Sequence, residues 1–471
     1  TLQVFLVIPG FGAAFLLLAA APLRRRLVGS LVALVALVAS AGWWVAIVEL
    51  TPASMRPYVG GSQSNSFLDL TFGYNGFGRL SGEETGSVGG GGGAAGGQWG
   101  STGLTRLFDA EIGGQISWLI PAAIILGVMG VVMRARAPRT DVRRAAYAVW
   151  GGWLLVTMLT FSFMAGIFHA YYTVALAPAV AALVGMGGAQ AWERRREPVG
   201  SLTMAAAGAA SSIWGFVLLS RTSAYSDVLR VGVLTIGMTC AALLVIGRRL
   251  HARALPVIVA GAVVAGLAGP TAYSLTTLTS GHTGSIVTAG PASGGMGGMP
   301  GAGGRGPGAR ALGGSTVGAP PAASSTTRGT VPTGAGGQGV GGGGMGGLLD
   351  ATTPSAAVIS ALRADAQRYT WVAAAVGSQS AAGLQLGTGE PVMAIGGFNG
   401  TDPSPTLAQF QAEVKAGKIH YLLASGGTSA GGGTSSAQTS DASRILAWAE
   451  ATYRQVTIGS TVFYDLTQPL D

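Results

Sequence analysis

The sequence has little charge and a large hydrophobic fraction. Of its 471 residues, 10% are charged and 49% are hydrophobic, and the mean hydropathy is +0.47. A soluble globular domain normally has about 25% charged residues. This composition excludes a soluble protein of this length and places most of the chain in lipid.

Cysteine and lysine are also scarce. Cys240 is the only cysteine and falls in an apolar run, so an internal disulfide, cysteine redox chemistry and a cysteine metal site are excluded. His420 has no partner at ligand spacing, so no metal site is supported and no cofactor is evident, although a need for a divalent metal stays open. The net charge of +9 comes almost entirely from arginine. It is not in itself a nucleic-acid footprint, and no nucleic-acid partner is expected.

Eight apolar stretches are long enough to cross a bilayer, which takes about 20 residues in a helix. The sequence therefore predicts a multispan α-helical membrane bundle over residues 1–280. The chain opens at Thr1 inside the first stretch, without a Met or a signal-peptide layout, so we expect a longer protein to continue upstream. The predicted spans are approximately 3–21, 27–50, 116–133, 145–164, 171–191, 203–220, 227–247 and 254–273.

Basic clusters occupy every second loop between these spans. They contain 14 of the 22 basic residues before residue 350, and the positive-inside rule assigns these loops to the cytoplasm. The remaining loops, including 51–115 and the turn at 162–170, are then external, together with everything after about residue 274. The clusters are Arg24, Arg25 and Arg26; Arg134, Arg136, Arg139, Arg143 and Arg144; Arg194, Arg195 and Arg196; and Arg248, Arg249 and Arg253.

The external loop 51–115 is longer than a connection requires, which is typical of functional or disordered segments. Its middle, 89–97, is nearly pure Gly and Ala and is expected to be flexible. Leu104, Leu107, Phe108 and Ile112 recur at helical spacing, so residues 104–115 are predicted to form a helix lying flat on the outer leaflet.

A second composition change divides the rest of the chain. Residues 281–349 are rich in Gly, Pro and Ser and predict a disordered linker. Residues 350–471 carry nine acidic and six basic residues and predict a small soluble α/β domain outside the cell. Its expected elements are helices at 356–366, 406–416 and 442–451, strands at 371–376, 391–395 and 419–424, a hairpin at 456–464, and a mobile Gly/Ser loop at 426–436.

Two places could carry chemistry. The loop 396–402 follows a strand and precedes a helix, where backbone N–H groups can hold a phosphate or a sugar, so Asn399 and Asp402 are candidate acceptor-binding residues; a tight turn of small residues is the alternative. The predicted outer face gathers arginines and aromatics that could hold a lipid-linked phosphate, since guanidinium binds phosphate oxygens bidentately. An ion-paired loop surface is the alternative there. These candidates for donor phosphate or sugar are Arg56, Tyr58, Tyr74, Arg79, Arg106, His169 and Tyr172.

Several motifs on that face resemble a known family. They are Arg56-Pro57-Tyr58, Gly73-Tyr74-Asn75-Gly76 with Arg79-Leu80, the stretch 108–121, His169-Ala170-Tyr171-Tyr172 and Ala177-Pro178. Together they are similar to the carboxy-terminal half of YkcB-type mannosyltransferases, which are related to bacterial aminoarabinose transferases and protein O-mannosyltransferases. The resemblance covers nearly the whole chain, including 371–400 in the tail.

The resemblance implies a bacterial multispan glycosyltransferase of the cell membrane. It would take a sugar, mannose or a related hexose, from a polyprenyl phosphate on the outer leaflet and give it to a glycan or lipid acceptor of the cell envelope. In such enzymes the catalytic carboxylate lies in the first external loop, so it is expected upstream of Thr1 and the catalytic residue of this chain is unknown. Where relatives have an Arg-Tyr pair, this sequence has His169 and Tyr171.

Two other functions remain open. The chain could be a non-catalytic, membrane-anchored module that binds or senses a glycan. A transporter ranks last, because the spans contain almost no ionisable residues at mid-depth.

Overall fold

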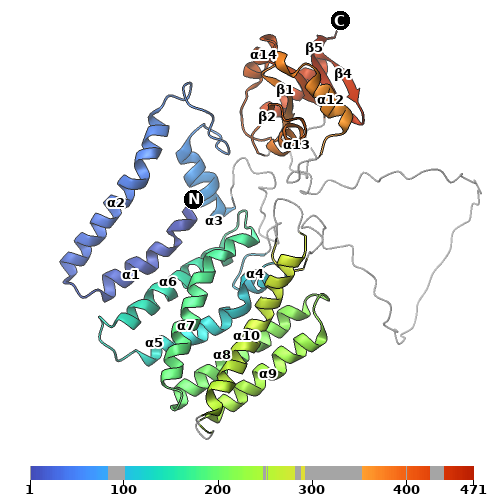
Figure 1. Cartoon of the computed structure of the whole chain (residues 1–471). Helices are drawn as coiled ribbons and strands as arrows, with labels where there is room; N and C mark the ends of the chain where they lie inside the picture. The colour runs from blue at the N-terminus through green and yellow to red at the C-terminus, as the bar shows by residue number, and fades with distance from the viewer. Residues whose placement is uncertain are drawn as a thin grey trace, which may run out of the picture.

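The computed structural model describes residues 2–82, 101–247, 251, 253–281, 288–291, 353–398, 400–424 and 440–470. A helical bundle comes first and a small α/β unit follows (Figure 1), as the sequence predicted. The glycine-rich stretch 89–97, most of the linker 281–349 and the loop 426–436 lie outside the described residues.

Within the described residues, seven helical stretches are long and apolar enough to span a bilayer, so this is a multi-pass membrane protein. The predicted first span is a shorter apolar helix, Gln3–Leu18, formed by η1 (Leu2–Val7) and α1 (Ile8–Leu18). The seven long stretches are Leu23–Leu50 (α2), Gly113–Met133 (α4, η4 and α5), Val142–Phe163 (α6), Ala170–Glu193 (η5 and α7), Pro198–Ser220 (α8), Asp227–Val245 (α9) and Ala254–Thr279 (α10).

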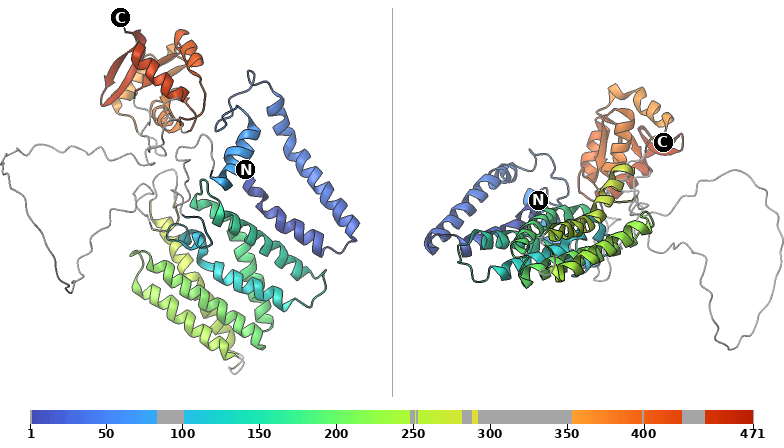
Figure 2. Two further views of the ribbon diagram at one scale, coloured as in Figure 1. Left: turned by 180° about the vertical axis from the view of Figure 1, so that it is seen from behind. Right: turned by 60° about the horizontal axis from the view of Figure 1, so that its bottom comes forward.

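The described arginines of the loops after α1, α5 and α7 lie at one end of the bundle, which we call the arginine-rich end. Arg139 donates to the carbonyls of Leu17 and Ala19, 3.1 and 3.0 Å away, and thereby joins the loop after α1 to the loop after α5. Arg143, at the start of α6, pairs with Glu193 at the end of α7 at 2.6 Å. The opposite end, which carries the segment 51–82 and the turn 164–169, is called the long-loop end (Figure 2).

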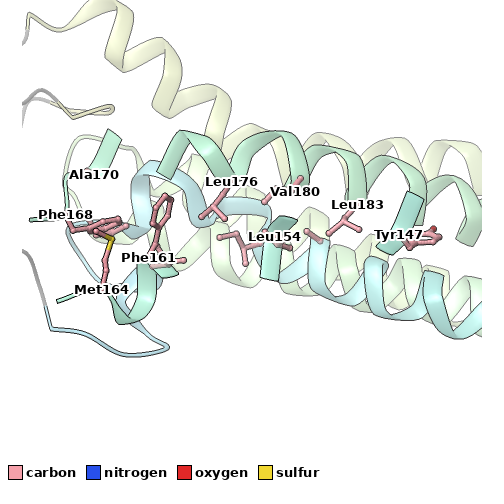
Figure 3. Packing of buried hydrophobic residues seen from close by; sticks show 14 residues of the cluster. Tyr147, Leu154, Phe161, Met164, Phe168, Ala170, Leu176, Val180 and Leu183 are labelled. Carbon is pink, nitrogen blue, oxygen red and sulfur yellow. The ribbon is translucent and has the colours of Figure 1, made fainter. Parts of the chain in front are cut away.

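The core of the bundle lies between α5, α6 and η5–α7. Figure 3 shows a row of apolar side chains from Phe168 and Met164 along α6 and α7 to Tyr147. Beside this row α1 crosses α6 with its backbone in contact, since a Cβ on Gly152 would lie 2.7 Å from the Cα of Gly10. Such small residues let membrane helices approach closely, and here they position η1 at the long-loop end.

The segment before α5 does not follow the sequence prediction of a flat surface helix over 104–115. Only η3 (Arg106–Phe108) and the short α4 (Gly113–Ile116) are helical there. Leu107 and Ile112 are buried in the core at 0% and 5% exposure, rather than facing lipid headgroups. Leu107 and Ile112 therefore serve the protein core, because the segment packs against α6 and η5, whereas Leu104 of the same stripe stays 67% exposed.

The α/β unit is a five-stranded sheet of order β2-β1-β3-β5-β4. β1 pairs in parallel with β2 and β3, through Ala373 with Val392 and Trp371 with Ile419, while β5 is antiparallel to β3 and β4. Its strands are β1 (Trp371–Val376), β2 (Val392–Ile395), β3 (Ile419–Leu423), β4 (Tyr453–Ile458) and β5 (Thr461–Pro469).

Helices cover both faces of this sheet. Side chains of α12 (Ala356–Ala364) and α13 (Ser378–Thr388) pack on one face, and those of α14 (Leu407–Lys415) and α15 (Asp441–Thr452) on the other. Central strand β1 is almost wholly buried, as expected of a parallel strand covered on both sides. The predicted helices, strands and terminal hairpin of the tail are confirmed, and α13 is the helix that the sequence did not predict.

Candidate functional site at the long-loop end

A cleft of about 140 Å³ opens at the long-loop end between η1, η2, α3, α6 and η5. Most of its lining is apolar, with polar side chains contributed by Gln3, Asn75, Arg79, Thr160 and Tyr172. A buried apolar recess with a few polar groups is the usual form of a small-molecule site. The lining residues are Gln3, Leu6, Asn75, Gly76, Phe77, Arg79, Leu80, Thr160, Phe161, Met164 and Tyr172.

An irregular helix supplies one wall of the cleft. η2 (Asp69–Phe77) is a π-helix, and Gly76 inside it departs from helical geometry at φ −122° and ψ −107°. π-helical turns are uncommon and occur frequently at functional sites. The irregularity, followed by α3 (Gly78–Ser81), places Asn75 and Arg79 on the cleft.

Backbone hydrogen bonds fix α3 against the turn after α6. The Leu80 carbonyl accepts from the Ala165 N–H at 3.1 Å, and the Arg79 carbonyl accepts from the Gly166 N–H at 2.9 Å. Gly82 then ends α3 in a left-handed conformation with its Cα facing Ala165. These hydrogen bonds join α3 and the turn after α6, which are far apart in the sequence, along one side of the cleft.

The Arg79 guanidinium is the cation of this cleft. Its Nη1 donates to the Ile167 carbonyl at 3.3 Å and its Nη2 to Asn75 Oδ1 at 3.5 Å, and it stacks over the Tyr74 ring with 4.8 Å to the centroid. Both hydrogen bonds are at the long end of the normal range. An anionic oxygen would make shorter, charge-assisted bonds with the same group.

The aromatic residues of the 169–172 turn stand beside Arg79. His169 stacks on Tyr171 at 5.3 Å and meets the Tyr172 ring edge-on at 5.4 Å. Burial, together with the positive charge of Arg79, lowers the pKa of His169 to about 4. The imidazole is therefore neutral at pH 7 and adds no positive charge to the site. The structure thus brings together Tyr74, Arg79, His169 and Tyr172.

Arg56 and Tyr58 lie in a separate turn and do not line the cleft. Arg56 pairs with Glu49 at 3.5 Å and donates to the carbonyl of Asn65. The Tyr58 hydroxyl donates to the Ser62 carbonyl. Both side chains hold the segment that follows α2 in a fixed shape.

Arg106 is buried in the protein core. It is 1% exposed, donates to the carbonyls of Met164 and Phe161 at 2.6 and 3.3 Å, and lies over the Phe168 ring at 4.4 Å. Burial lowers the pKa of its guanidinium. In this position Arg106 ties the turn after α6 to η3 and is not among the residues lining the cleft.

The two acceptor-binding candidates are placed differently. Asn399 lies outside the described residues. Asp402 is 5% exposed and accepts a hydrogen bond from the Gly61 N–H at 2.8 Å. Among the described residues no group of three or more His, Cys, Asp or Glu side chains is arranged to hold a metal ion.

A second, apolar cleft of about 410 Å³ adjoins the first, because Gln3 and Leu6 line both. Its other lining residues include Val7, Trp153 and Thr157. Sequence reasoning did not find Gln3, Thr160 or this cleft, since these polar residues stand singly inside apolar spans and nothing marks them from neighbours that face lipid. Of the residues that the structure describes, no aspartate or glutamate lines either cleft.

The chain is similar in sequence to known proteins over most of its length. Residues 358–452, from α12 to α15, match the family model described as "Putative mannosyltransferase YkcB-like, C-terminal". The chain is 28% identical over 90% of its length to "Putative mannosyltransferase YkcB" of Bacillus subtilis (strain 168). The resemblance to YkcB-type proteins is confirmed. A second B. subtilis protein, "Putative mannosyltransferase YycA", is 25% identical over 90% of this chain.

The chain spans 65% of the length of YkcB and 66% of the length of YycA. The similarity covers both the helical bundle and the α/β unit of this chain, whereas the family model covers the α/β unit alone. No solved structure matches the chain significantly.

Proposed function

We propose that this chain is part of a membrane glycosyltransferase that moves a sugar, mannose or a related hexose, from a polyprenyl-phosphate donor to a cell-envelope glycan or lipid. The reaction takes place at the long-loop end, which faces the outside of the cell membrane according to the arginine distribution. The names of the B. subtilis relatives support the reaction class.

The observation that carries the proposal is the position of Arg79 in the wall of a cleft that adjoins a second, apolar cleft. A polyprenyl-phosphate donor has a phosphate at the membrane boundary and an apolar chain in the bilayer. Arg79 would bind the phosphate with its planar fork, and the adjoining apolar cleft would accept the first part of the lipid chain. Tyr172 and Asn75 are the polar side chains beside it and would contact the phosphate or the sugar.

This chain then supplies donor binding, and the catalytic carboxylate comes from the first external loop of the complete protein. Its role would be that of a general base that deprotonates the acceptor hydroxyl while the polyprenyl phosphate departs.

The proposal is tested with the complete natural protein in vesicles, supplied with radiolabelled polyprenyl-phosphate mannose and a cell-envelope acceptor fraction. Label should move to the acceptor, and Arg79→Ala should reduce transfer. Arg136→Ala, an exposed residue of the arginine-rich end, is the matched control and should transfer normally. No transfer with any donor, combined with glycan binding by the α/β unit, would favour the non-catalytic sensing module instead.

A further inference from the structure

The α/β unit touches the helical bundle through a buried carboxylate. Asp402, in the loop after β2, accepts a hydrogen bond from the Gly61 N–H at 2.8 Å, although the two residues are 341 positions apart. The Asp402 residue is 5% exposed. A Cβ on Gly60 would lie 3.7 Å from the same oxygen, so the contact has normal van der Waals packing around it.

The loop that carries Asp402 is shaped for this contact by its own backbone. The Asp402 N–H donates to the Gly396 carbonyl at 3.1 Å, and the Gly396 N–H donates to the Ser404 carbonyl at 2.9 Å. Gly397 has φ +65°, and a Cβ there would lie 2.1 Å from Asp402 Oδ2. Only glycine fits at position 397, because any side chain there would collide with the Asp402 carboxylate.

The turn that receives Asp402 is equally fixed. The Ser62 N–H donates to the Val59 carbonyl at 3.2 Å, and Gly61 has φ +83°, the left-handed conformation that a type II turn requires at its third position. The Val59 N–H donates to Asn65 Oδ1 at 2.8 Å, and the Tyr58 hydroxyl caps the Ser62 carbonyl. Both partners therefore present the Asp402 and Gly61 groups without rearrangement, which lowers the cost of association.

We propose that residues 400–405, in the loop after β2, form a docking surface through which the α/β unit binds the turn 59–62 of the same chain, with Asp402 as its anchor. This assigns Asp402 to an intramolecular interface rather than to acceptor binding. The assignment rests on this contact alone and does not depend on the transfer reaction.

The turn 59–62 that Asp402 contacts is connected to one wall of the candidate site. Beyond the turn, the Gln63 N–H and the Ser64 hydroxyl donate to Asp69 Oδ2 at 3.1 and 3.0 Å. Asp69 begins the π-helix η2, and Asn75 near its other end lines the cleft. The docked α/β unit is thus joined through one short, hydrogen-bonded segment to the wall that positions Arg79.

A modest interface is sufficient here, because both partners belong to one chain. Placing both partners in one chain makes their association intramolecular, at an effective concentration that can reach about the millimolar range. A contact with a dissociation constant in that range is therefore substantially formed within the chain, while it would be too weak to hold two separate proteins together. Loss of a single anchor can then release the unit.

The test is a distance measurement by pulsed electron spin resonance on the whole chain in vesicles, in a Cys240→Ser background. One spin label is placed at Met55→Cys, which is 78% exposed. The other is placed at Ala412→Cys, exposed on α14, which lies on the side of the α/β unit turned away from the bundle (Figure 1). Docking predicts one narrow distance distribution.

Asp402→Lys should replace the narrow distribution with a broad one, because it removes the acceptor and buries a positive charge against the turn. Gly61→Val, which puts a β-branched residue in the left-handed position of the turn on the bundle side and leaves the α/β core intact, should do the same. Asp365→Lys, an exposed acid of the α/β unit, is the charge-matched control and should keep the narrow peak. A broad distribution in the parent chain, or a narrow one in both Asp402→Lys and Gly61→Val, would overturn the proposal.

Discussion

Arg79 and Arg106 contact the same turn after α6 and yet stand in opposite environments. Arg106 is 1% exposed and donates to the carbonyls of Phe161 and Met164 at distances down to 2.6 Å. Arg79 is half-buried, lines a cleft and makes longer bonds to Ile167 and Asn75. Each also lies over an aromatic ring, Phe168 for Arg106 and Tyr74 for Arg79.

The comparison shows that an arginine at a membrane boundary is not by itself a phosphate site. Burying a guanidinium costs free energy unless the protein supplies acceptors for its N–H groups. For Arg106 these acceptors are the Phe161 and Met164 carbonyls, and the hydrogen bonds stabilise the fold. Arg79 donates long hydrogen bonds to Ile167 and Asn75 and lines a cavity, which is the arrangement expected of a ligand-binding group. Replacement of Arg106 is therefore expected to destabilise the fold, whereas replacement of Arg79 is expected to weaken donor binding.

The largest effect is expected for Arg106→Ala. Removal of the side chain leaves the Phe161 and Met164 carbonyls without their donor in a buried site, which costs about 1–3 kcal/mol for each unsatisfied group, in addition to the lost packing. Thermal unfolding of the purified protein in detergent should show a clear decrease in Tm. Arg79→Ala in the same assay should have a Tm near that of the parent, and an equal decrease for both would remove the distinction between the two arginines.

Arg79→Lys probes binding geometry rather than stability. Lysine keeps the positive charge but presents a single ammonium in place of the planar fork, so one of two parallel bonds to a phosphate is lost. Donor-dependent transfer should fall about tenfold, equivalent to about 1.4 kcal/mol, with little change in Tm. Full activity of this variant would mean that Arg79 acts only through its charge or does not contact the donor.

The sequence predicted the architecture well and the site only in part. Apolar run lengths gave the spans, and in the α/β unit strand β1 was predicted with its observed bounds because a buried parallel strand leaves a continuous apolar run, here Trp371–Val376. Helix α13 was missed because its Ser, Gln and Gly residues carry little helical patterning. For such a segment, packing against the rest of the domain decides whether a helix forms.

The site depends on contacts that sequence patterns do not encode. Arg79 and Arg106 are both arginines beside aromatic residues in one long loop, and nothing local separates them. The distinction arises when Ala165 and Gly166 pair with Leu80 and Arg79, since this long-range pairing sets which guanidinium borders the cleft. Asp402 was likewise selected for its loop and not for its partner, because Gly61 is far away in the sequence.

A smaller effect is expected for Tyr74→Leu. The Tyr74 ring lies under Arg79, and a cation–π contact at a partly exposed site contributes about 0.5–1 kcal/mol. The apparent donor affinity should fall by about two- to fivefold in titrations with polyprenyl phosphate. Phe72→Leu, an exposed aromatic of the same π-helix, is the matched control, and an equal loss in both variants would point to the helix rather than to the contact with Arg79.

The smallest effect at neutral pH is expected for His169→Asn, which becomes visible only in acid. The pKa of His169 is lowered from 6.5 to about 4 by burial and by Arg79. The neutral imidazole therefore contributes its full stability above pH 6.5, and this contribution decreases as the pH falls from 6.5 toward 4, because the unfolded chain binds the proton more readily. Tm measured from pH 7 to pH 4 should fall less steeply in His169→Asn than in the parent. Arg79→Ala should also flatten the curve in part, since it removes the neighbouring charge, whereas identical slopes in all three proteins would show that the imidazole is not held near Arg79 in this environment.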